Sequence, residues 1–119
     1  MRIRLTAGET VLEAALNDNE TTRDFVSLLP LTLRMGDLFG REKYGHLPRA
    51  LAAGGPRQRS FEVGDVAYWP PGPDVAIFYD HDSQSIPDPG IAVLGTTDSG
   101  AGALKKYDGP VQVTIDVAG

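Results

Sequence analysis

The sequence predicts a mainly β protein: a closed, eight-stranded antiparallel barrel with one short helix capping a mouth and space for a second helical turn. Apolar and polar residues alternate with period two over much of the chain, which is typical of strands. Segments with helical periodicity are scarce. The 119 residues, 41% of them hydrophobic, suffice for one domain spanning residues 1–119. About eight strands on so short a chain favour closure, because a closed sheet has no exposed edges.

The first half of the chain predicts a hairpin, the helix and two strands. Residues 1–6 alternate, Gly8-Glu9 offers a turn, and residues 12, 14 and 16 share one face of the returning strand. Asn19 or Thr21 can cap a helix, which Pro30 ends. Residues 29–35 then place leucines on one face of a strand, and residues 41–46 form a short one.

The second half predicts further strands. Residues 61–69 and 75–79 flank a Pro-Pro-Gly-Pro tip and form a hairpin, residues 91–97 form another strand, and residues 111–117 show the cleanest alternation. A second helical turn is expected around residues 103–107. The face of the first helix that carries Phe25 and Leu29 should close one mouth of the barrel. The side chains expected inside it are Ile3, Leu5, Leu12, Leu31, Leu33, Val113 and Ile115.

Composition restricts the function. Eleven Lys and Arg against sixteen Asp and Glu give a net charge of −5, which argues against binding to nucleic acid or to an anionic membrane. The absence of cysteine excludes disulfides, thiolate nucleophiles and iron–sulfur clusters. No apolar run resembles a signal peptide or a membrane span, so a cytoplasmic location is expected.

Motifs for chemistry are few. The Asp80-His81-Asp82 triplet lies in a stretch of loop composition, and adjacent residues of an extended chain diverge, so we expect neither a metal nor another cofactor. Gly100 to Lys105 lacks the ending of a phosphate-binding loop, and the common hydrolase motifs do not occur. No catalytic residue is assigned.

One group of residues suggests a groove on the outer wall of the barrel. Arg34 lies on the strand face opposite the leucines, so it points outward if they point inward. The residues that would accompany it are Tyr44, His46, Tyr68, Trp69 and Tyr79. The alternative is that Trp69, Phe78 and at least one tyrosine belong to the core.

Three segments resemble the small bacterial cyclophilin-like proteins: Leu-Pro-Leu-Thr-Leu-Arg-Met-Gly-Asp-Leu at 29–38, Glu-Lys-Tyr-Gly-His-Leu-Pro at 42–48, and Gly-Asp-Val-Ala-Tyr-Trp-Pro-Pro-Gly at 64–72. The resemblance spans nearly the whole chain and implies a cyclophilin-type barrel reduced in helix. The Phe-His-Arg and Phe-Met-x-Gln-Gly-Gly motifs of true prolyl isomerases are absent, so it does not imply their activity.

Three functions remain open. The first is a non-catalytic module that binds an unknown small molecule or peptide in the outer groove, as a monomer or weak homodimer. The second is a weak peptidyl-prolyl cis-trans isomerase with Arg34 as the donor to the twisting amide. The third is a structural domain that associates with itself through an exposed strand or hairpin.

Overall fold

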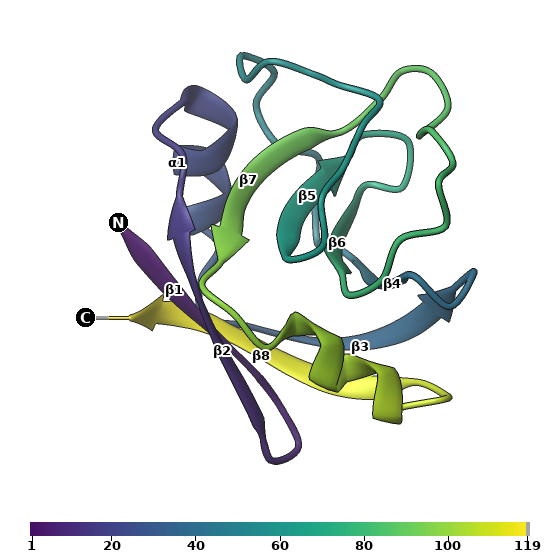
Figure 1. Cartoon of the computed structure of the whole chain (residues 1–119). Coiled ribbons are helices and arrows are strands. Elements are labelled where there is room, and N and C mark those ends of the chain that lie inside the picture. The colour runs from purple at the N-terminus through teal and green to yellow at the C-terminus, as the bar shows by residue number, and fades with distance from the viewer. Residues whose placement is uncertain (119) are drawn as a thin grey trace.

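The eight strands close into an antiparallel barrel, as the sequence predicts (Figure 1). The computed structural model describes residues 1–118. Around the barrel the strands follow the order β1-β2-β7-β5-β6-β4-β3-β8. In chain order they are β1 (Arg2–Ala7), β2 (Thr10–Leu16), β3 (Leu31–Leu38), β4 (Glu42–His46), β5 (Asp65–Trp69), β6 (Asp74–Phe78), β7 (Ala92–Thr97) and β8 (Val111–Ala118). No helix among residues 1–118 is long and apolar enough to cross a membrane.

The first two strands form the predicted hairpin. Ala7 pairs with Thr10, which leaves Gly8 and Glu9 as a two-residue turn. Gly8 has φ +57°, a conformation that the mirror-image hairpin turns require and that glycine adopts without strain. The register places Leu5 opposite Leu12, and both side chains are buried inside the barrel.

The core inside the barrel contains five of the seven residues expected there. Ile3, Leu5, Leu12, Val113 and Ile115 are all buried. The expectation is wrong for the other two, since Leu31 and Leu33 are only half-buried and pack against the edge of the core. β3 pairs with β4 only over residues 36–38, so over residues 31–35 it is hydrogen-bonded to β8 alone.

The helix α1 (Glu20–Val26) closes one end of the barrel (Figure 1). Asn19 is its N-cap, and its side chain accepts a hydrogen bond of 2.9 Å from the backbone N–H of Thr22. Thr21, the alternative cap, instead donates to the carbonyl of Ala52. Phe25 is fully buried in the barrel core, so the helix contributes packing as well as cover.

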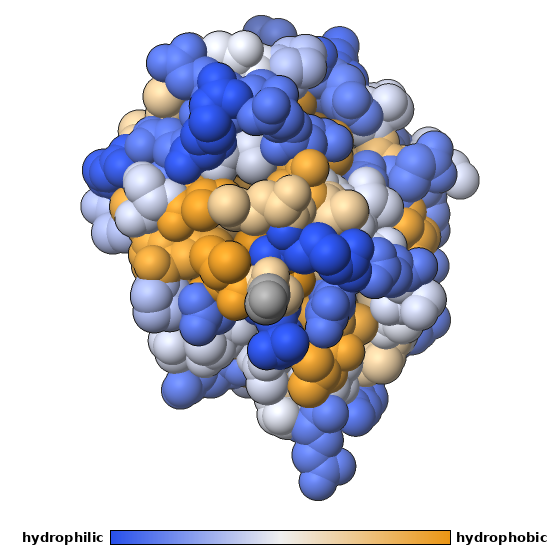
Figure 2. All heavy atoms as spheres, turned by 90° about the vertical axis from the view of Figure 1, so that its left-hand side faces the viewer, coloured by the Kyte–Doolittle hydropathy of each residue, from blue (hydrophilic) through white to orange (hydrophobic). Residues whose placement is uncertain are grey.

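The rim of the barrel next to the chain ends carries apolar side chains. Val117 pairs with buried Ile3 and shares its face of the sheet, yet it is 45% exposed because it lies at the end of the barrel. Met1, two residues before Ile3 in the sequence, is also exposed. Figure 2 shows this side of the molecule, with hydrophobic side chains grouped between hydrophilic ones. Alternation therefore predicts which face a residue takes but not how deeply it is covered.

Strands β5 and β6 are buried on both faces. Their inward side chains join the barrel core, whereas their outward side chains belong to a second cluster, here called the outer cluster. Its buried members are Phe61, Ala67, Ala76, Phe78, Ile86 and Ile91. The loop segments around residues 61 and 86–91 supply half of them and cover this wall of the barrel.

A lysine lies inside the barrel. Lys43 occupies an inward position on β4, between two outward residues, and its side chain has no exposed surface. Its ammonium group donates to Asp37 Oδ1 at 3.1 Å and to the carbonyl of Tyr107, which follows the 3-10 helix η1 (Ala101–Lys106). Tyr79 donates its hydroxyl hydrogen to the same oxygen of Asp37. These polar contacts fasten η1 to the barrel wall.

Candidate functional site

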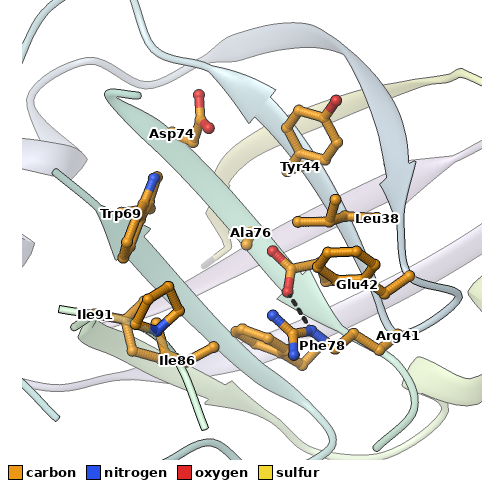
Figure 3. A pocket seen from close by; sticks show the side chains of 12 residues that line it. Leu38, Arg41, Glu42, Tyr44, Trp69, Asp74, Ala76, Phe78, Ile86 and Ile91 are labelled. Carbon is orange, nitrogen blue, oxygen red and sulfur yellow. Dashed lines mark hydrogen bonds and ion pairs between the residues drawn. The ribbon is translucent and has the colours of Figure 1, made fainter. Parts of the chain in front are cut away.

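A pocket of about 310 Å³ lies against the outer wall of the barrel (Figure 3). Its floor is formed by β4, β5 and β6, and its far side by the loop around residues 86–91. The volume is at the lower end of the range for small-molecule sites, roughly 300–1,000 Å³. The lining residues are Leu38, Phe39, Arg41, Glu42, Tyr44, Trp69, Asp74, Ala76, Phe78, Ile86, Pro87 and Ile91.

The strand register explains how the aromatic walls of the pocket arise. Tyr44 pairs with Ala76, and Trp69 with Asp74, so outward positions of three adjacent strands face the same space. Ala76 has the small side chain that leaves room between them. Figure 3 shows Trp69 and Tyr44 on opposite sides, with Ala76 at the centre and Phe78 and Ile86 below. The result is an apolar slot on a rigid sheet.

A buried ion pair lies at one end of this slot. The guanidinium of Arg41 donates from Nε to Glu42 Oε2 at 2.9 Å and from a terminal nitrogen to Asp82 at 3.1 and 3.3 Å. The Arg41 side chain is 6% exposed and that of Glu42 is 9%. Burial raises the pKa of the Glu42 carboxyl, and the bond and charge of Arg41 only partly offset it.

The other end of the slot holds a second carboxylate. Asp74 Oδ1 lies 2.5 Å from Nδ1 of His46, whose side chain is 75% exposed. The Asp74 side chain is largely buried, and its Oδ1 makes no hydrogen bond of acceptable geometry with residues 1–118. The pocket therefore combines an apolar middle with a carboxylate near each end.

Comparison with known proteins assigns the chain to a family. The model of the Cyclophilin-like family matches residues 5–116. The chain belongs to the Cyclophilin-like family. A similar solved structure is the solution structure of the hypothetical protein AF2241 from Archaeoglobus fulgidus, at 25% identity and a TM-score of 0.77. That likeness covers 99% of this cyclophilin-like chain and 95% of the archaeal one. The search of curated proteins gave no match.

The residues proposed for the groove on the outer wall lie in three places: at the pocket, on the exposed surface of β3 and in the barrel core. Tyr44 and Trp69 line the pocket, and His46 contacts its Asp74 from the rim. Arg34 is exposed on β3 and does not line the pocket.

Two of the predicted groove residues point the other way, which corrects the expectation for them. Tyr68 faces the barrel core, and its hydroxyl accepts from the backbone N–H of Leu51. Tyr79 also belongs to the barrel core and bonds to Asp37. The alternative that some of these aromatics are core thus applies to Tyr68 and Tyr79.

Sequence reasoning missed the two carboxylates of the pocket. Glu42 and Asp74 stand at the first positions of two paired strands, where a charge is usually solvated, so composition gave no reason to single them out. A usable signal existed for Glu42, because it has the same strand parity as Tyr44 and thus shares its face. The burial of Glu42 depends on the loops that cover this wall, and strand parity does not predict them.

The acidic triplet around His81 does not assemble a site. Asp80 pairs with Lys105, Asp82 with Arg41, and the His81 ring stacks on Phe61 at 4.2 Å between centroids. Within residues 1–118 no group of three or more His, Asp or Glu side chains is arranged to hold a metal ion.

Proposed function

We propose that this cyclophilin-like protein is a non-catalytic binding module whose outer-wall pocket takes an apolar small molecule or an apolar side chain of a peptide. The observation that carries the proposal is the slot between Trp69 and Tyr44, open above Ala76 and apolar in its middle. Aromatic side walls with few polar groups at defined positions are typical of ligand sites. The net charge of −5 favours such a partner over nucleic acid or an anionic membrane.

The rigidity of the pocket supports binding. Its floor consists of three hydrogen-bonded strands whose inner faces pack on the barrel core. The covering loop is fixed as well, because Gln58 and Ile91 form a two-way backbone bridge and Arg59 Nε donates to the carbonyl of Ile86 at 2.8 Å. A preformed site loses little conformational entropy when a ligand enters.

The state of the arginines supports a non-catalytic role. Prolyl isomerisation needs a donor free to bond to the twisting amide. Arg41 is the only lysine or arginine among the residues that line the pocket, and its Nε and one terminal nitrogen already donate to Glu42 and Asp82. Arg34 lies outside the pocket. Among the residues that line the pocket, no arginine is therefore free of a carboxylate partner to serve as that donor.

The single tryptophan of the chain provides the test. Because Trp69 lines the pocket, its fluorescence reports on this site without labelling. Titration with 2-phenylethanol, a small neutral probe with one aromatic ring, should give a saturable change in emission. Amide chemical shifts should move along β4–β6 and stay constant in β1 and β2.

A filling substitution controls for non-specific effects. Ala76→Leu adds three carbon atoms at the centre of the slot and should abolish the response while the protein stays folded. Ala103→Leu makes the same change at an exposed position of η1 and should bind like the wild type. Unsaturable emission changes, or equal responses from the two variants, would reject the outer-wall site.

A further inference from the structure

We infer that the outer-wall pocket selects ligands in which a protonated amine is attached to an apolar group, and that Glu42 is the residue that binds the amine. This inference rests on the proposed function, since it names the chemical class of ligand for the same pocket. Its evidence is separate, because it comes from the polar atoms of the pocket and not from the apolar slot.

The first observation is the unused oxygen of Glu42. Its Oε2 accepts from Arg41, whereas Oε1 makes no hydrogen bond with any of residues 1–118. Figure 3 shows the carboxylate directed from β4 into the slot, between Phe78 and Ala76. The side chain is 9% exposed, and Oε1 is not among the fully enclosed polar atoms without a partner, so this oxygen keeps some accessible surface next to the pocket. A carboxylate oxygen that has no protein partner and lies beside an apolar pocket favours a ligand that brings a donor.

The second observation is the balance of charge around the slot. Arg41 pairs with the carboxylates of Glu42 and Asp82, and a third carboxylate, that of Asp74, lies at the other end of the slot. His46 adds a positive charge only when it is protonated, and its ring lies mostly in solvent. The negative excess attracts a cation and repels a carboxylate or a phosphate.

The two observations together select an amine over a neutral donor. An alcohol could satisfy Oε1, but it would leave the excess negative charge in place. An ammonium group satisfies the oxygen and neutralises the charge, and it also reduces the cost of keeping the buried Glu42 ionised. The apolar part of the ligand then extends over Ala76 between Trp69 and Tyr44.

A matched series of probes tests the inference. 2-Phenylethylamine, 2-phenylethanol and 3-phenylpropanoate share the ring and a short linker but are a cation, a neutral molecule and an anion at pH 7. Titrations followed by Trp69 emission should show the amine binding about 10-fold or more tightly than the alcohol, and the carboxylate most weakly. Charge-assisted hydrogen bonds are strong enough for a ratio of this size.

A charge-removing variant identifies the residue. Glu42→Gln places an amide donor where the carboxylate stood, so the amine should lose its advantage over the alcohol, while the alcohol keeps its affinity within about 3-fold. Glu9→Gln removes a charge at an exposed turn and should leave the ratio unchanged. The comparison in the wild type needs no variant, so a poorly folded Glu42→Gln protein would not block the test.

The outcomes separate the two proposals. If none of the three probes binds, the proposed function fails and this inference fails with it. If the alcohol binds but the amine binds no more tightly, or the carboxylate binds best, only the amine selectivity is rejected. A preference for the amine that persists in Glu42→Gln would reject Glu42 as its partner.

Discussion

Replacing Lys43 with methionine removes the charge from inside the barrel while keeping a linear, apolar side chain of similar length. In the native protein the ammonium group bonds to Asp37 and to the carbonyl of Tyr107. The variant leaves this carbonyl without its donor and Asp37 without its cation. Because removing one partner of a buried pair exposes the full desolvation cost of the other, the barrel should lose stability.

The structure sets the size of this loss. Deleting one partner of a buried ion pair costs about 3–5 kcal/mol. The Asp37 side chain is 24% exposed and keeps its bonds from Tyr79 and from the backbone N–H of Gly40, so water and neighbours still stabilise it. We therefore expect the lower end, about 3 kcal/mol, which lowers the melting temperature of a chain of this length by about 10 °C.

Urea unfolding followed by circular dichroism measures the effect, with the same substitution at an exposed lysine as control. Lys105 pairs with Asp80 at 3.2 Å with most of its side chain in solvent, and such pairs contribute little. Lys105→Met should leave the urea midpoint nearly unchanged. If Lys43→Met unfolds at the same urea concentration as Lys105→Met, the buried network does not hold the barrel together as we argue.

Three further predictions concern packing, pH and catalysis. Leu94→Ala, at a fully buried position, should lower the free energy of unfolding in urea by about 2–5 kcal/mol. Leu33→Ala should lower it distinctly less, because Leu33 is half-buried. Equal losses from the two variants would contradict the burial assigned to β3. The side-chain bond from Arg49 and the backbone bond from Ala52 lower the pKa of Asp24, so its stabilising contribution is present above about pH 4 and is lost as the pH falls toward the lowered value. Asp24→Asn should therefore make the melting temperature less sensitive to pH between about 5 and 2, and an unchanged slope would refute this role. An X-Pro tetrapeptide assay should show no isomerisation above background; acceleration that Arg34→Ala abolishes in a folded protein would favour the enzyme.

The barrel itself could be predicted because it is encoded locally. The alternation along β1, β2 and β8 places Ile3, Leu12 and Ile115 on one face, and each is buried there. The hairpin between β5 and β6 follows from its proline-rich tip, although β5 begins at Asp65 rather than near residue 61. Turns and period-two patterns act within a few residues, so the sequence displays them directly.

The pocket could be predicted only in part, because it depends on contacts between distant segments. Residues of β5 and β6 are buried on both faces, so no alternation distinguishes inward Tyr68 from outward Trp69. The choice depends on register with β7, where a bulge lies between Val66 and Ala67. Glu42 acquires its role because the loop carrying Asp82 holds Arg41 against it. Such tertiary placement leaves no local pattern.

Because β5 and β6 are buried on both faces, this small protein has two separate hydrophobic clusters, one on each side of the sheet. The barrel core determines whether the chain folds, whereas the outer cluster determines what the wall presents. Because the sheet separates them, substitutions at Ala76 and at Leu94 share no cavity, and their energetic effects should add. Substitutions at Tyr44 and Trp69 can thus reshape the outer pocket without repacking the barrel interior.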